Sequence, residues 1–183
     1  MKRHWLSIGS AVGSAARLAL PAAVAITLLV AMPAQAVVAG DAAPGFVLPG
    51  DADTTVSLAD LRGKVVLVDF WASWCAPCRR SFPWLNEMQQ KYGPRGFTVV
   101  AVNVDKKRAD AQRFLQQYPA RFAIAFDEAG LTPSKFAVKA MPSSFLVDAR
   151  GKIVQVEVGF TDEGKDALEE RIQSLLPSAV ALW

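Results

Sequence analysis

The spacing of apolar residues after position 44 predicts an alternation of strands and helices. Nearly continuous runs of β-branched and aromatic residues at 65–71 and 97–104 are typical of buried strands. Between these runs, apolar side chains from Cys78 to Tyr92 recur at steps of three and four residues, which predicts a helix with one buried face. The same helical spacing recurs around Phe114. Further apolar runs predict strands at 122–126, 144–147 and 153–158.

Turn and capping residues complete this pattern. A proline–glycine turn between two short apolar runs, 46–48 and 55–57, predicts an N-terminal β-hairpin. A short helix is expected over 131–138, and Thr161 is the expected N-cap of a last helix over 162–176. Strands alternating with helices, then a strand hairpin and a closing helix, predict an α/β fold. Its central sheet is expected to be mostly parallel, with an antiparallel edge hairpin and flanking helices.

The first 36 residues have the pattern of a secretory signal peptide. Basic residues at the start precede an apolar run over 18–32, and Ala34-Gln35-Ala36 is an A-x-A cleavage site. The apolar run is shorter than the roughly 20 residues that cross a bilayer as a helix. The alternative is an uncleaved membrane anchor, because the wider stretch 7–32 is only mildly polar.

Removing the signal changes the charge of the protein. The chain carries a formal net charge of +3, and Lys2, Arg3 and Arg17 lie in the signal, which contains no acidic residue. The remainder is therefore neutral overall and lacks the basic surface expected of a nucleic-acid-binding protein. We expect a short linker over 37–43 and a single domain over 44–183, a length that supports one hydrophobic core.

Cys75 and Cys78 are the only cysteines of the chain, spaced C-x-x-C shortly after the predicted strand 65–71. This order places a thiol at a helix N-terminus, where free N–H groups and the helix dipole stabilise a thiolate. A structural zinc site would need four Cys or His ligands, and the only histidine, His4, lies in the predicted signal. A structural disulfide three residues apart would close a very small loop and restrict the unfolded chain little. The motif therefore favours redox chemistry.

These motifs resemble the thioredoxin family. Val68-Asp69-Phe70-Trp71-Ala72-Ser73-Trp74-Cys75-Ala76-Pro77-Cys78 is similar to the active-site strand and loop of that family, and Pro83 matches the proline that kinks its following helix. Met141-Pro142-Ser143-Ser144-Phe145-Leu146-Val147-Asp148 is similar to the segment that carries its cis-proline. With the exported N-terminus and the leading hairpin, the chain resembles the extracytoplasmic TlpA/ResA-like branch, which implies a thioredoxin-like fold.

The resemblance implies roles by position. Cys75 would be the exposed nucleophile and Cys78 the buried thiol that resolves the mixed disulfide. Pro77 would hold the first helical turn, and Trp74 would shield and dock the disulfide, unless it is simply a half-exposed packing aromatic. Pro142 is expected to be cis and to face the cysteine pair. The expected substrate-binding residues are Trp74, Ala76, Pro77, Met141 and Pro142.

Asp69 is the third expected catalytic residue. A carboxylate is costly in an otherwise apolar strand, so burial should raise its pKa and allow it to accept the proton of Cys78. The alternative is an edge-facing aspartate bound to water. Two departures from the family make Asp69 more important: Ala101 stands where thioredoxins often carry a lysine, and Ser81 stands where many ResA-like proteins have a glutamate.

The function implied is that of an exported thiol–disulfide oxidoreductase, periplasmic or secreted, or anchored to the inner membrane if the signal stays. It would be a monomer that reduces protein disulfides and is re-reduced by a membrane thiol donor, without cofactor, metal or nucleic acid. Haem-site cysteines of apocytochrome c and thiols of copper-site assembly proteins are the implied substrates. The alternatives are a net disulfide oxidant or isomerase, and a chaperone that binds Cu(I) through the same two thiols.

Overall fold

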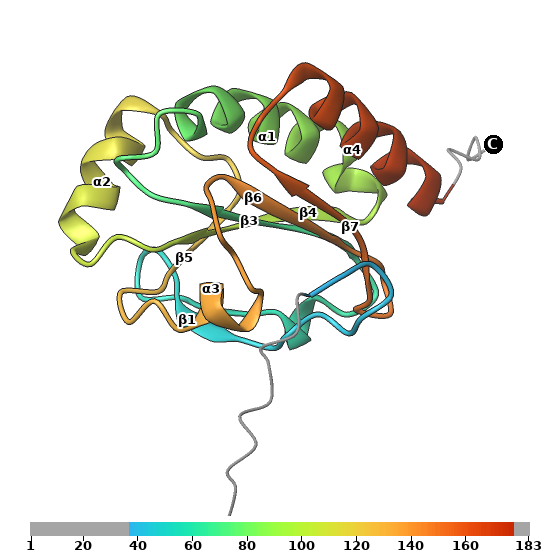
Figure 1. The fold of residues 1–183 in the computed structure, drawn as a ribbon, viewed down its shortest axis with the longest axis horizontal. Coiled ribbons are helices and arrows are strands. Elements are labelled where there is room, and N and C mark those ends of the chain that lie inside the picture. Colours follow the sequence, from blue (N-terminus) through green and yellow to red (C-terminus); the bar gives the residue numbers. More distant parts are fainter. Residues whose placement is uncertain (1–36, 178–183) are drawn as a thin grey trace, which may run out of the picture. The chain divides into compact units, whose positions relative to one another are not determined.

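Five strands form the central sheet of the computed structural model, which describes residues 37–177 (Figure 1). The strand order is β5-β4-β3-β6-β7. β3 pairs in parallel with β4, and β4 with β5, whereas β6 runs antiparallel to both β3 and β7. The predicted mostly parallel sheet with an antiparallel hairpin at one edge is therefore confirmed. The strands are β3 (Val65–Trp71), β4 (Phe97–Asn103), β5 (Ala123–Phe126), β6 (Ser143–Val147) and β7 (Ile153–Val158).

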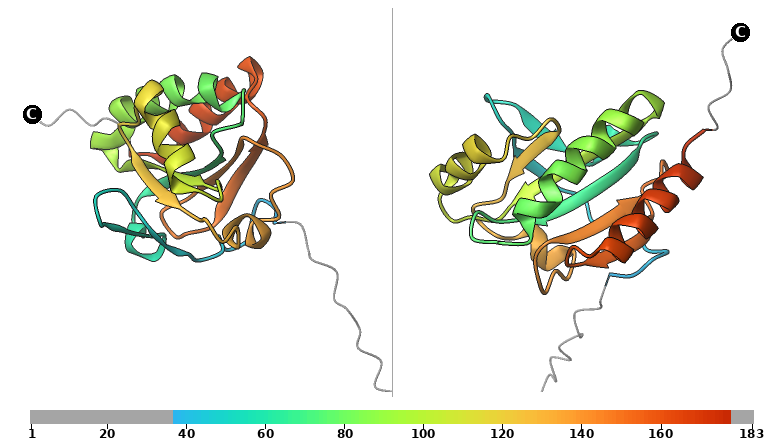
Figure 2. Two further views of the ribbon diagram at one scale, coloured as in Figure 1. Left: turned by 90° about the vertical axis from the view of Figure 1, so that its left-hand side faces the viewer. Right: turned by 90° about the horizontal axis from the view of Figure 1, so that it is seen from above.

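Helices cover both faces of this sheet (Figures 1 and 2). The helices α1 (Cys78–Tyr92), α2 (Arg108–Gln117) and α4 (Asp162–Leu175) pack on one face. The other face carries α3 (Thr132–Lys135) and the predicted N-terminal hairpin, formed by β1 (Val47–Pro49) and β2 (Thr55–Ser57). Within residues 37–177, no helix combines the length and the apolar character needed to cross a membrane.

β3 is the centre of both cores. All seven of its residues are buried. Leu67 and Trp71 belong to the core under α1, while Val66 and Phe70 belong to the core under α3. Because neighbouring residues of a strand point to opposite faces, burial on both faces explains the nearly continuous apolar run that predicted this strand.

Several predicted elements differ from the structure at their ends. The helix expected over 131–138 is limited to α3, because Ala137 adopts a left-handed backbone (φ 52°) that ends the helix. The strand expected from residue 122 begins at Ala123, the first residue of β5 that pairs with β4. α1 continues from Cys78 to Tyr92 through Pro83, and Thr161 caps α4 as predicted by accepting the Gly164 N–H.

Part of the expected linker 37–43 is built into the fold. Gly40 donates its N–H to the Ile153 carbonyl oxygen at 2.8 Å, and Ile153 donates to the Asp41 carbonyl oxygen at 2.9 Å. Ala43 is buried in the core under α3. These residues cover the start of β7, an edge strand whose free backbone groups would otherwise need other partners. From Gly40 onward, the segment expected as a linker therefore pairs with the sheet.

The topology defines one functional edge of the sheet. β3, β4 and β5 run in the same direction, so their carboxyl ends lie together, and loops at this edge carry binding groups in α/β sheets. β6 starts at the same edge, because Ser143 pairs with Phe70. The Cys75 loop and the Pro142 segment therefore leave the sheet at neighbouring positions.

Candidate active site

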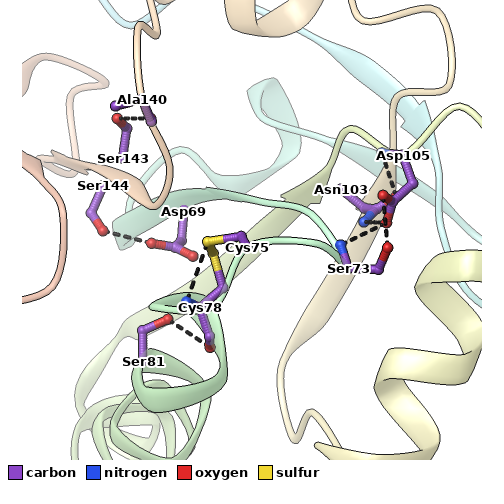
Figure 3. The surroundings of a disulfide bond; sticks show 10 residues. All are labelled: Asp69, Ser73, Cys75, Cys78, Ser81, Asn103, Asp105, Ala140, Ser143 and Ser144. Atoms are coloured by element: carbon purple, nitrogen blue, oxygen red, sulfur yellow. Dashed lines mark hydrogen bonds between the residues drawn. A yellow bond between two sulfur atoms is a disulfide. The ribbon is translucent and has the colours of Figure 1, made fainter.

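Cys75 and Cys78 form a disulfide at the start of α1 (Figure 3). The N–H of Cys78 points back at Cys75, with its nitrogen 3.3 Å from Sγ and 3.2 Å from the carbonyl oxygen. After reduction, the same N–H and the helix dipole would stabilise negative charge on Cys75 Sγ. The local geometry therefore favours a thiolate at Cys75 after reduction.

The disulfide itself has little contact with solvent. Cys75 is 3% exposed and Cys78 is 0% exposed. The expectation of an exposed Cys75 is therefore wrong in degree, because its sulfur is bonded to Cys78 and turned towards the first N–H of the helix. The residues beside it are exposed instead: Trp74 retains 68% of its surface, and Ala76 is exposed as well.

Asp69 lies behind the disulfide in the middle of β3. Its side chain is buried, and its carboxyl points towards the cysteine pair in Figure 3. The Ser144 hydroxyl donates to Oδ1 at 2.6 Å, whereas Oδ2 is buried without a hydrogen-bond partner in the described part of the chain. Burial raises the pKa of Asp69 to about 7, with the Ser144 hydrogen bond acting in the opposite direction.

Among residues 37–177, no basic side chain offsets the burial of Asp69. The register pairs Asp69 with Ala101 of β4, so the neighbour of the acid on this strand is an alanine. Ser81 of α1, which stands where many ResA-like proteins have a glutamate, is buried, and its hydroxyl donates to the Cys78 carbonyl oxygen. This position therefore supplies no second carboxyl group. Asp69 is therefore the carboxyl group that this arrangement places behind the pair.

A buried polar cluster holds the loop between β3 and the disulfide. Asp105 Oδ2 accepts the Ser73 N–H at 2.9 Å, and Oδ1 accepts the Ser73 hydroxyl at 3.0 Å. The Asn103 side-chain amide also donates to Oδ2 at 2.8 Å, and its oxygen accepts the Asp105 N–H. This carboxylate thus fixes the backbone two residues before Cys75 (Figure 3).

The segment before β6 supports the other side of the site. The Met141–Pro142 peptide bond is cis, as predicted. Pro142 is buried and its carbonyl oxygen accepts the Gly159 N–H at 2.8 Å, while the Ser143 hydroxyl donates to the Ala140 carbonyl oxygen at 2.7 Å. Met141 is partly buried against the core that contains both cysteines.

Sequence reasoning missed four residues of this site: Ser73, Asn103, Asp105 and Ser144. Asn103 and Asp105 carried a weak signal, because polar residues at the carboxyl end of a buried strand often serve a site. Ser144 carried none, since a serine next to a second serine has no distinctive pattern. Its importance follows only from its pairing with Asp69 across the sheet.

Comparisons with known proteins agree with this geometry. The family model described as Redoxin matches residues 38–172, a range that includes every residue of the site. A thiol-disulfide oxidoreductase ResA from Bacillus cereus is 33% identical over 138 residues, covering 75% of this chain and 79% of that protein. A solved structure from Chlorobium tepidum, described as a candidate thiol:disulfide interchange protein DsbE, is 53% identical with a TM-score of 0.74, covering 76% of this chain and 99% of that chain. A candidate protein disulfide isomerase from Bacteroides thetaiotaomicron is 26% identical with a TM-score of 0.71. This match covers 76% of this chain and 91% of that chain.

The Asp105 cluster predicts a loss of stability when its carboxylate is removed. Asp105→Ala leaves the Ser73 N–H and hydroxyl and the Asn103 amide without their acceptor, which we expect to lower the free energy of unfolding by about 3 kcal/mol. Urea unfolding of the oxidised protein measures this change. Asp110→Ala is the matched control, because Asp110 is partly exposed on α2 and pairs with Arg113 one turn away. Equal effects of the two variants would contradict the cluster's role.

Burial of Asp69 predicts that stability falls as pH rises. The pKa is 3.8 in the unfolded reference and about 7 in the fold, so the native state holds the proton over this interval and the unfolded state does not. The contribution is fully present below pH 3.8 and is lost as pH rises through 7. A gap of roughly three pH units corresponds to about 4 kcal/mol as an upper value.

Asp69→Asn removes this titration while keeping an oxygen that can accept from Ser144. We therefore expect the variant to match the wild type near pH 4 and to be more stable by up to about 4 kcal/mol at pH 8. Unfolding of both oxidised proteins at several pH values gives the difference. Parallel stability curves would mean that the carboxyl does not titrate near neutral pH.

Proposed function

The chain belongs to the Redoxin family and is a thiol-disulfide oxidoreductase, and from this premise we propose that it reduces disulfides of exported proteins. The placement of the cysteine pair carries the proposal. Cys75 Sγ faces the first N–H of α1, the neighbouring Trp74 and Ala76 are exposed, and the buried Asp69 carboxyl lies behind the pair. A substrate disulfide can approach from the exposed side while a proton is handled from the buried side.

The reaction consists of two exchanges that transfer two electrons. The Cys75 thiolate attacks one sulfur of the substrate disulfide, and the other substrate sulfur leaves as a thiolate that takes a proton from solvent. Cys78 then attacks Cys75 Sγ and displaces the second substrate sulfur. The products are the Cys75–Cys78 disulfide and a reduced substrate dithiol.

Asp69 acts in the second exchange. Cys78 is completely buried, so its thiol proton has no direct exit to solvent. The free Oδ2 atom of Asp69 is the acceptor within the same buried region, and a pKa of about 7 keeps an ionised fraction available at neutral pH. Asp69 would then return the proton to the departing substrate thiolate or to solvent.

The substrate-binding surface combines exposed apolar contacts with backbone groups. Trp74, Ala76 and Pro77 surround Cys75 on the outer side, and Trp74 supplies a large apolar contact. Met141 and Pro142 leave the sheet at the same edge. We propose that the Met141 backbone pairs with an extended substrate segment, a mode that tolerates many sequences.

The compartment and partners follow from the predicted signal, which lies outside the described residues. We propose a periplasmic or secreted enzyme, or one anchored to the inner membrane if the signal is retained. An oxidising compartment requires a membrane thiol donor to return the pair to its reduced form. Haem-site cysteines of apocytochrome c and thiols of copper-site assembly proteins are the proposed substrates.

Two other functions use the same thiols. A net oxidant or isomerase differs only in the direction of exchange, and the likeness to the Bacteroides thetaiotaomicron protein is the observation that favours it. A Cu(I) chaperone would use both thiolates as soft ligands. Within the described residues, no group of three His, Cys, Asp or Glu side chains forms a metal-binding cluster. Titrating the reduced protein with copper, and measuring its disulfide turnover in parallel, distinguishes a Cu(I) chaperone from an oxidoreductase.

The two cysteines are predicted to react differently. In the reduced protein near pH 6, iodoacetamide should label Cys75 before Cys78, because only Cys75 has exposed surface and an N–H at its sulfur. Cys78→Ser should accumulate a mixed disulfide with an oxidised model peptide, whereas Cys75→Ser should not. Mass spectrometry of the quenched reactions shows both results. Equal labelling, or trapping by Cys75→Ser, would contradict these roles.

Replacing Asp69 is predicted to slow resolution more than attack. Asp69→Asn leaves Cys75 and its helix N–H in place but removes the proton acceptor for Cys78. We expect resolution at pH 7 to slow about 10-fold or more, with the initial attack changed less than threefold, on the scale of general base catalysis. Rapid-quench kinetics separates the two steps.

Asp127→Asn is the matched control for this experiment. Asp127 is also a buried aspartate, but it accepts the N–H groups of Gly130 and Thr132 next to α3. If both variants slow resolution equally, or if Asp69→Asn leaves the rate unchanged from pH 6 to 9, Asp69 does not carry the proton.

A further inference from the structure

Ser144 contacts the buried acid directly and has no place in the reaction described so far. It lies on β6 directly opposite Asp69, and cross-strand partners project from the same face of a sheet. Its hydroxyl donates to Asp69 Oδ1 at 2.6 Å, and the residue is only 6% exposed. We propose that Ser144 is a positioning residue of the exchange reaction, which holds Oδ1 so that Oδ2 alone carries the proton. This inference rests on the proposed role of Asp69.

The hydrogen-bond chemistry assigns the two carboxyl oxygens. An ionised carboxylate only accepts hydrogen bonds, so the Ser144 hydroxyl must be the donor. When Asp69 is protonated, one oxygen becomes a hydroxyl and the other stays an acceptor. In the proposed arrangement the Ser144 hydroxyl remains the donor to Oδ1 in both states, which leaves the proton on Oδ2, the oxygen without a partner in the described residues.

The positions of Ser144 and the disulfide determine which way each carboxyl oxygen of Asp69 points. Ser144 and the disulfide lie on opposite sides of the Asp69 carboxyl in Figure 3. Holding one oxygen on the Ser144 side therefore turns the other towards the cysteines. Without that hold, the carboxyl could rotate about its last side-chain bond, and either oxygen could face either side.

Among the neighbours of Asp69, Ser144 is the side chain whose hydrogen bond changes the pKa of the acid. β4 contributes Ala101, and the start of α1 contributes the Cys75–Cys78 disulfide, whose cysteines do not titrate in the oxidised protein. The next acid along the sheet is Glu157 of β7, which pairs with Ser144 rather than with Asp69. The Ser144 hydrogen bond favours the ionised form and so limits the rise in the pKa of Asp69 that burial causes.

The first experiment measures the titration of Asp69 itself. Carboxyl carbon NMR of the oxidised protein should show the pKa of Asp69 about one pH unit higher in Ser144→Ala, because a hydrogen bond to the charged form is lost. Ser144→Thr keeps the hydroxyl and should restore the wild-type value. Ser143→Ala is the matched control: its hydroxyl bonds to the Ala140 carbonyl oxygen, so this variant should leave the titration unchanged.

The second experiment links the titration to the reaction. The midpoint of the pH profile for resolution should move upward with the pKa in Ser144→Ala, which makes resolution about fivefold slower at pH 7. Ser144→Thr should recover the rate. In an Asp69→Asn background, Ser144→Ala should have no further effect on the profile, because the group that it positions is gone.

The outcomes separate this inference from the function on which it rests. If Asp69→Asn alters the pH profile but Ser144→Ala moves neither the pKa nor the midpoint, the positioning role is wrong and the proton role stands. If Ser144→Ala moves the pKa while no variant alters the profile, both the proton role of Asp69 and this inference are wrong. An Asp69 titration that shifts equally in Ser143→Ala would show a general loosening of the segment and would also overturn the inference.

Discussion

An ionisable carboxyl in the middle of a strand that is buried on both faces is the constraint on which the site depends. Asp69 is 1% exposed and has no basic neighbour in its cross-strand pairs, and its carboxyl makes a single hydrogen bond within the described part of the chain. Its charged form is therefore expensive, and the group holds its proton to about pH 7. The same property that destabilises the fold at high pH underlies the proposed role of this group as a proton acceptor inside the protein.

The rest of the site supports this buried acid and the disulfide from three directions. β3 carries Asp69, the end of β4 carries the Asp105 cluster that holds Ser73, and the start of β6 carries Ser144. All of these polar groups lie behind the disulfide or beside its loop. The outer side presents Trp74 and Ala76 instead. Hydrogen bonds fix the groups behind the disulfide, while the residues in front of it are exposed to solvent. This arrangement suits an enzyme whose substrates are other protein chains.

Local signals made the framework predictable from the sequence. β3 begins and ends where its apolar run does, and α1 spans the residues from Cys78 to Tyr92. The pairing of Asp69 with Ala101 followed from the resemblance and is confirmed by the register. Each of these depends on a continuous stretch of sequence or on a known motif.

Contacts that depend on the register of the sheet were not predictable in the same way. Ser144 is 75 residues from Asp69, and Asp105 is 32 residues from Ser73. No pattern within either segment marks these side chains as partners. The low exposure of Cys75 was missed for a similar reason, because it depends on how the disulfide turns against the helix. The pairing of Gly40 with Ile153 likewise required the position of β7.

The direction of electron transfer is the central claim of the proposed function, and the reduction potential of the Cys75–Cys78 pair tests it most directly. The potential is measured at pH 7 by equilibrating the protein with a dithiol buffer of known poise and quantifying the two redox forms. A reductant of exported disulfides should show a value near that of thioredoxin, roughly −270 mV. A value near about −120 mV, as in strong periplasmic oxidants, would contradict the account and identify the protein as a disulfide donor.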